Sequence, residues 1–129
     1  MHTLATLYLA ARIYAHRAHN LVCGPSFFAD HAFLGELYDI YDDAYDALVE
    51  RMLGLGQAVE PIKLTEAAIK MVQADPCRNF FSRLLEYEKK IRTEIKLLAP
   101  STSDGTQNLL QGLADESEQR TYKMTQRCA

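Results

Sequence analysis

The fold of this chain is set by residues 19–56, which read HNLVCGPSFFADHAFLGELYDIYDDAYDALVERMLGLG. One short break, Cys23-Gly24-Pro25, separates two segments that have the apolar spacing of helices. Glycine is common just after a helix, and proline is common at the start of the next one. Residues 26–53 contain no proline and carry two apolar stripes at spacings of three and four. A helix with two apolar stripes is covered on two sides, so this stretch predicts a helix within a bundle.

The other segments follow the same helical pattern, with bounds marked by proline, glycine and capping residues. Long helices are expected over residues 3–22, 26–53, 75–99 and 103–127. The third of these is expected to have Asp75 as its N-cap and Pro76 in its first turn. The connection over residues 54–75 holds a short helical piece at 64–72 and is long enough to cross from one end of a bundle to the other. Because no segment alternates between apolar and polar residues, we expect an all-α four-helix bundle that forms a single domain over residues 1–129.

Composition is ordinary for a globular protein, with 48% apolar and 24% charged residues among 129. No apolar run approaches the roughly 20 residues of a membrane span, and the N-terminal segment reads as an amphipathic helix rather than a signal peptide. The net charge of -3 offers no general attraction for nucleic acid. Cys23, Cys77 and Cys128 are odd in number, far apart and without metal-ligand spacing, so we expect no disulfide framework and a cytoplasmic location.

Four residues of types that bind transition metals stand out: His19, His31, Asp46 and Glu50. At about 1.5 Å rise per residue, His31 and Asp46 lie roughly 22 Å apart along one helix. A metal–ligand distance is near 2 Å, so one ion cannot bind both of them within a chain. Asp46 and Glu50 are four residues apart and share a helix face.

Two copies of the chain can bring the four residues together. If two helices pair antiparallel about a two-fold axis near Asp39, position 31 of one copy lies opposite position 47 of the other. Asp46 and Glu50 then come within reach of His31, and His19 can approach His31 within its own chain. Mixed imidazole and carboxylate ligands suit iron, with zinc or manganese as competitors. The alternative is that His31 is a packed, satisfied histidine and the two acids are solvated.

These residues give the chain a resemblance to the Dps-type mini-ferritins. The family pattern has a histidine ending the first helix, a Gly-Pro-x-Phe-Phe-like turn, a second histidine twelve residues on, an acid fifteen residues later and a glutamate four after that. The matching positions here are His19, Gly24 to Phe28, His31, Asp46, Glu50-Arg51 and Gly54. Residues 104–124, DGTQNLLQGLADESEQRTYKM, resemble the family's fourth helix, with Tyr122 where a tryptophan is common.

The resemblance implies a ferritin-like four-helix bundle with a short helix in the long crossover between the second and third helices. It implies a homo-oligomeric shell of twelve subunits, built from two-fold dimers. It also implies that His19, His31, Asp46 and Glu50 form ferroxidase sites at the two-fold interfaces. There ferrous iron would be oxidised, with hydrogen peroxide the favoured oxidant, and ferric mineral would be stored inside the shell. Removing ferrous iron in this way protects DNA from oxidative damage.

The chain departs from the family pattern at several places. Gly35 stands where an acidic ligand usually follows the second histidine, and Glu36 points about 100° away on the helix. Asn20 replaces an aromatic residue that often follows the first histidine. The chain starts almost at its first helix, without the Lys-rich tail that many DNA-binding members use, so we do not expect direct DNA binding. Asp104 is the candidate for an acid lining an iron-admitting pore, with a helix N-cap as the alternative.

Two other functions remain open on the sequence. One is a non-catalytic assembly protein that kept the Dps-like fold and lost the metal chemistry, which Gly35 and Asn20 would allow. The other is a DNA-compacting protein with a degenerate metal site.

Overall fold

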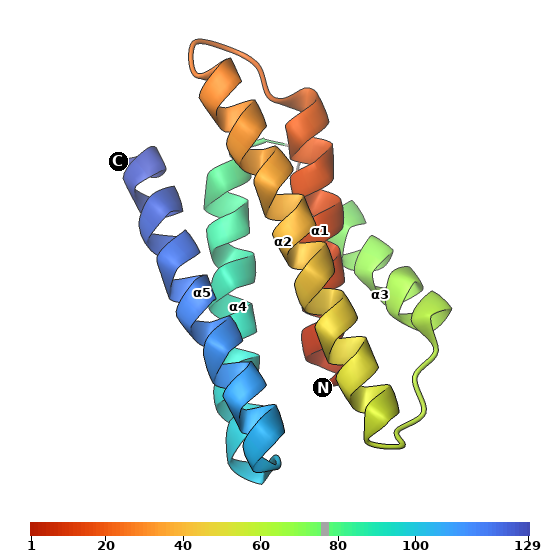
Figure 1. The fold of residues 1–129 in the computed structure, drawn as a ribbon. Coiled ribbons are helices and arrows are strands. Elements are labelled where there is room, and N and C mark those ends of the chain that lie inside the picture. The colour runs from red at the N-terminus through yellow and green to blue at the C-terminus, as the bar shows by residue number, and fades with distance from the viewer. Residues whose placement is uncertain (76–77) are drawn as a thin grey trace.

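The computed structural model describes residues 1–75 and 78–129, and within them every regular element is a helix. The elements are α1 (His2–Leu21), α2 (Phe27–Gly54), α3 (Pro61–Gln73), α4 (Phe80–Leu98), the 3-10 helix η1 (Ala99–Ser101) and α5 (Asp104–Cys128). In Figure 1, α1 and α5 run in one direction and α2 and α4 in the other, while α3 lies in the crossover that carries the chain back along the bundle. The expected all-α bundle with a short crossover helix is therefore confirmed. Among the described helices, none has the length and apolar character needed to span a membrane.

The break that divides the first two helices forms as the sequence indicated. α1 ends at Leu21, and the Val22 N–H still donates to the Ala18 carbonyl over 2.8 Å. Gly24 then takes φ +99°, a conformation that costs glycine little and an L side chain much. This reversal lays α2 antiparallel against α1 (Figure 1). His19 therefore lies near the start of α2, beside His31.

The start of α4 differs from the sequence-based expectation. The helix begins at Phe80, with Asn79 in the left-handed conformation at its N-cap, and not at Asp75. The Asp75 carboxylate instead accepts a hydrogen bond from the Tyr87 hydroxyl and pairs with Arg83 over 3.3 Å. These partners lie on the first turns of α4, so Asp75 anchors the helix from outside. The expected first-turn position of Pro76 lies outside the described residues.

α1 is the most enclosed helix, because it packs against α2, α3 and α4. Its predicted stripe is buried throughout: Leu4, Leu7, Ala11, Ala15, Ala18 and Val22. α2 contributes a buried face from Leu34 to Met52, while α4 packs against both α1 and α5.

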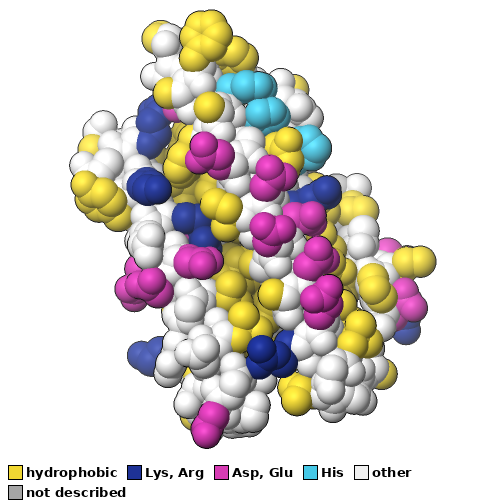
Figure 2. All heavy atoms as spheres, viewed as in Figure 1, with side chains coloured by type: hydrophobic (Ala, Val, Ile, Leu, Met, Phe, Trp, Pro, Cys, Tyr) yellow, Lys and Arg dark blue, Asp and Glu magenta, His cyan; other side chains and the backbone are white. Residues whose placement is uncertain are grey.

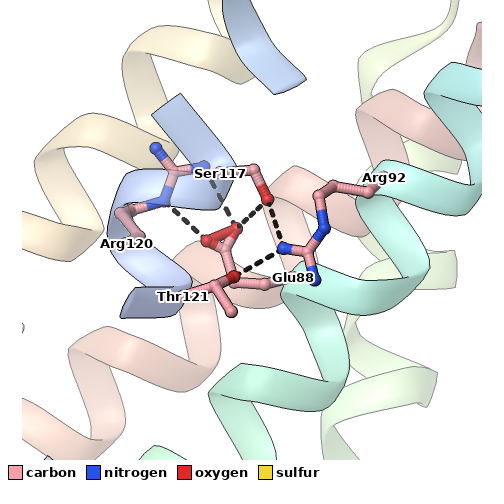
Figure 3. Close-up of polar contacts among 5 residues, drawn as sticks. All are labelled: Glu88, Arg92, Ser117, Arg120 and Thr121. Carbon is pink, nitrogen blue, oxygen red and sulfur yellow. Dashed lines mark hydrogen bonds and ion pairs between the residues drawn. The ribbon is translucent and has the colours of Figure 1, made fainter. Parts of the chain in front are cut away.

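A buried polar network joins α4 to α5 (Figure 3). The Glu88 carboxylate is fully buried and accepts two hydrogen bonds from the Arg120 guanidinium, at 2.6 Å and 3.0 Å. Ser117 donates to the same carboxylate over 3.3 Å and accepts from Arg92 over 3.0 Å. A buried charge is tolerated when it is paired and hydrogen-bonded in this way.

Candidate functional site

His19 and His31 lie side by side on neighbouring helices and bind each other's main chain. His19 Nδ1 is 2.7 Å from the His31 carbonyl oxygen, and His31 Nδ1 is 2.8 Å from the His19 carbonyl oxygen. The His19 carbonyl is in the last turn of α1, and the His31 carbonyl is in the first turns of α2. The two helix ends are thereby joined by a reciprocal pair of hydrogen bonds. The predicted approach of His19 to His31 within one chain is thus present in the structure.

These hydrogen bonds fix which ring nitrogen carries the proton. A carbonyl oxygen only accepts, so each Nδ1 must be the N–H donor. In the neutral imidazole the Nε2 atom then carries a free lone pair. A histidine that donates its other ring N–H to a carbonyl is the usual arrangement for a metal ligand, because that bond holds both tautomer and ring. Both side chains are half-buried, and both have this arrangement.

The two imidazoles are stacked, with ring centroids 3.7 Å apart and an angle of 19° between their planes. A metal–nitrogen bond lies near the plane of its imidazole and is about 2 Å long. Two nearly parallel rings at this separation cannot both direct their lone pairs to one ion. The pair therefore offers two separate nitrogen donors at neighbouring positions, and not a two-point chelate.

Gly35 lies directly under the His19 ring. A Cβ atom at position 35 would be 3.1 Å from His19 Cε1 and 3.2 Å from its Nδ1, closer than an ordinary contact. The same Cβ would be 4.0 Å from His19 Nε2. The place where the family pattern has an acidic side chain is therefore partly filled by the imidazole of His19. The sequence shows that the acid is missing, and only the fold shows that His19 takes its space.

An aromatic row continues from the histidine pair on both sides. The Phe27 ring stacks on His31, with centroids 4.9 Å apart. The Tyr38 ring meets His19 edge-on at 5.4 Å and is itself stacked on His16 at 4.2 Å. These contacts restrict the rings of His19 and His31 to one orientation. His16 is not among the residues that the sequence pattern singled out, although it precedes His19 by about one helical turn.

Asp46 and Glu50 are exposed on α2, away from the histidine pair of their own chain. Among the described residues, no three His, Cys, Asp or Glu side chains gather closely enough to hold one ion. In the view of Figure 2, histidine side chains cluster near one end of the molecule, and acidic side chains run in a column below them. The exposed acids of α2 are Glu36, Asp39, Asp43, Asp46 and Glu50. A single chain therefore separates His19 and His31 from Asp46 and Glu50, as the helix rise required.

Two polar contacts fix α2 against α5, one near each group of candidate ligands. The buried Asp30 carboxylate, next to His31, accepts two hydrogen bonds from Arg127 at 2.9 Å and 2.7 Å. At the other end Arg51, next to Glu50, donates to the Thr106 hydroxyl over 3.3 Å. The two contacts lie near opposite ends of α2, so together they set its position against α5. Each contact is also one residue from a candidate ligand.

Other residues singled out in the sequence have structural surroundings of their own. Ser103 is the N-cap of α5, with its hydroxyl 3.4 Å from the Thr106 N–H, so the capping alternative for Asp104 is wrong. Asp104 is exposed in the first turn of α5. Cys23 and Cys128 are both exposed and line one open pocket of about 510 Å³, while Cys77 lies outside the described residues.

Comparisons with known proteins agree with this architecture. Residues 1–128 match the family model of the ferritin-like domain. The chain is also similar to the DNA protection during starvation protein of Helicobacter pylori, with 32% identity over 89 aligned residues. The aligned region covers 65% of this chain and 62% of the relative, so it spans less than two thirds of the relative's length.

Proposed function

The chain belongs to the ferritin-like domain family, and from that premise we propose that it is an iron-oxidising, iron-storing mini-ferritin. Its substrate is ferrous iron, which is oxidised at sites shared by two subunits and kept as ferric mineral inside a hollow shell. Such a protein protects DNA by removing the ferrous iron that generates hydroxyl radicals. The relative that protects DNA during starvation supports this assignment.

The observation that carries the proposal is the reciprocal contact of His19 and His31. Each Nδ1 donates to a carbonyl, at 2.7 Å and 2.8 Å, and each Nε2 is left with its lone pair. The pair thus holds two nitrogen donors in fixed orientation on a half-buried surface, as the second contacts of metal-binding histidines do.

A second copy of the chain supplies the carboxylates in this proposal. The exposed face of α2 is apolar near its two ends, where Phe28 is 87% exposed and Leu53 is 52% exposed. An antiparallel pair about Asp39 sets position 28 of one copy against position 50 of the other, so Phe28 of each copy is covered near Glu50 of its partner. The acids between these ends would repel one another in such a pair. Bound cations offset this repulsion, which favours a dimer that carries metal.

Each ligand type has its own part in the reaction. His19 and His31 donate neutral nitrogens that hold ferrous iron, while Asp46 and Glu50 of the second copy supply the negative charge that favours the ferric product. Two ferrous ions give one electron each to hydrogen peroxide, which takes up two protons and leaves as two water molecules. Asp30 and Arg51 position these ligands through their bonds to α5.

The test is ferrous oxidation by the assembled protein, followed by absorbance of the ferric product. Glu50→Ala removes a carboxylate from each site and is expected to slow oxidation at least tenfold, while leaving the fold unchanged because Glu50 is exposed. Glu118→Ala removes an equally exposed carboxylate from α5 and is the matched control. Unchanged kinetics in the Glu50 variant would contradict the proposed oxidation site.

The proposed assembly is a dodecamer built from two-fold dimers. Its mass in solution, measured by light scattering, tests this directly, and a monomer or dimer would leave no cavity for mineral. Direct DNA binding is not part of the proposal, since the net charge is -3. A gel-shift assay at low salt near neutral pH, without divalent ions, should accordingly show no retarded band.

One observation favours a second candidate function, a Dps-like assembly protein without catalysis. His19 occupies space at Gly35 that a carboxylate ligand would need. Anomalous scattering from crystals soaked in ferrous iron separates the two candidates. Iron peaks beside His19 and His31 support the ferroxidase, and a site without peaks but with ordered side chains supports the assembly protein.

A further inference from the structure

Gly35 bears on which metal binds at the histidine pair, an inference that rests on the proposed function. Residue 35 lies one helical turn after His31, and positions four apart share a helix face. A side chain at 35 would start 4.0 Å from His19 Nε2 as well. Position 35 is thus the place on this chain from which one carboxylate could serve a metal held by either imidazole.

The chain has no carboxylate at this place. Gly35 has no side chain, and His19 Cε1 is 3.1 Å from where a Cβ would be. Within the described residues no acid joins the two histidines to make a three-ligand group. At each site the subunit that supplies the two histidines therefore brings no acid of its own, and all negative charge has to come from Asp46 and Glu50 of the second copy.

Imidazole donors and carboxylate donors favour different ions. Imidazole suits zinc, copper and iron, whereas carboxylate oxygens suit manganese and magnesium, and divalent affinity generally rises from manganese and iron toward copper and zinc. When the subunit that supplies the imidazoles adds no acid, that difference widens. We propose that Gly35 determines metal selectivity at this site by leaving the histidine-bearing subunit without a carboxylate ligand, so that zinc competes strongly with ferrous iron.

The proposal is tested by equilibrium binding to the assembled protein, without any oxidation step. Manganese is a redox-inert stand-in for ferrous iron, and electron paramagnetic resonance reports its free concentration directly. Added zinc then displaces bound manganese and gives the ratio of the two affinities. The wild type is compared with Gly35→Asp, which adds a carboxylate, and with Gly35→Ala, which adds the crowding Cβ alone. His31→Ala identifies the manganese that is bound at this site.

Gly35→Asp is expected to raise the affinity for manganese about tenfold and the affinity for zinc by less. The ratio of zinc affinity to manganese affinity should therefore fall. Gly35→Ala should leave the ratio within about twofold of the wild type, since it adds no ligand. An unchanged ratio in the Asp variant, or an equal change in the Ala variant, would overturn the inference. In that case normal iron oxidation by the wild type would leave the proposed function intact. Melting temperature and assembled mass, measured for each variant, confirm that the compared proteins are folded.

Discussion

His19 and His31 each donate from Nδ1 to the main-chain carbonyl of the other, over 2.7 Å and 2.8 Å. This reciprocal pair is a structural link between α1 and α2, and in the proposed function it also prepares two metal donors. Its two roles can be separated by experiment, because the link uses Nδ1 and a metal would use Nε2.

The tautomers of the histidines can be observed directly. In metal-free protein in mildly alkaline buffer, nitrogen-15 chemical shifts should show a protonated Nδ1 and a bare Nε2 for His19 and His31. His2 is an internal control, because its Nε2 is the atom next to a carbonyl, that of Ala58 at 3.0 Å, and it should show the opposite tautomer. Added zinc should shift the Nε2 signals of His19 and His31 and leave those of His2 in place. Protonated Nε2 atoms in the metal-free pair would contradict the arrangement described above.

Breaking the buried pair of Glu88 and Arg120 should cost much of the protein's stability. Arg120→Ala leaves a fully buried carboxylate without its two strongest hydrogen bonds and is expected to lower the free energy of unfolding by about 3–5 kcal/mol. Replacing both residues by methionine removes the stranded charge and should recover most of that loss. Glu86→Ala, which breaks an exposed pair with Arg83 on the same helix, should cost roughly 0–1 kcal/mol. Chemical denaturation of the four proteins measures these differences.

Two buried tyrosines differ in whether their hydroxyl has a partner. The Tyr41 hydroxyl has no hydrogen bond to another described residue, whereas the Tyr87 hydroxyl donates to Asp75. Tyr41→Phe should therefore leave the free energy of unfolding unchanged or raise it by about 1 kcal/mol, while Tyr87→Phe should lower it by a similar amount. Equal losses in the two variants would indicate that Tyr41 has a partner, such as an internal water.

The same tyrosines set the response of stability to alkaline pH. Burial raises the pKa of Tyr41 well above its ordinary value, and the Glu88 charge adds to this while Arg120 opposes it. A group with a raised folded-state pKa binds more protons when folded, so its contribution is complete below the unfolded value of about 10 and is lost as pH rises beyond it. The free energy of unfolding should thus fall above about pH 10, and less steeply in Tyr41→Phe. An identical slope in the variant would show that other groups govern alkaline unfolding.

The contact between Asp30 and Arg127 should stabilise the end of the bundle that carries His31. Arg127→Ala leaves the buried Asp30 carboxylate without its two-point partner and is expected to cost about 1–3 kcal/mol. Because Asp30 directly precedes His31, hydrogen exchange at the start of α2 should also become faster. Lys123→Ala removes another exposed cation from α5 and should change neither quantity. If the free energy of unfolding falls but hydrogen exchange near His31 does not become faster, the contact does not stabilise the part of α2 that carries His31.

Much of the fold was predictable because its signals are local. Gly24 and Pro25 predicted the break between the first two helices, and α1 ends at Leu21 while α2 begins at Phe27. The crossover helix was expected at 64–72 and begins earlier, at Pro61. The start of α4 was not predictable in this way. Asp75 has the chemistry of an N-cap, but its carboxylate is engaged by Tyr87 and Arg83 from the following helix. A local signal was thus overridden by a contact that exists only after the chain has folded.

The sequence alone showed which residues are candidate metal ligands and that one chain cannot bring all four of them to one ion. Helix rise alone separates His31 from Asp46 by roughly 22 Å, whatever the surrounding fold. Only the tertiary structure decided that His19 stacks on His31, that both rings present a bare Nε2, and that the His19 ring lies over Gly35. It also decided that Glu88 meets Arg120 in the core. The physical reason is register: contacts between two helices depend on how far one is shifted and turned against the other, and that is set by the packing of the whole bundle.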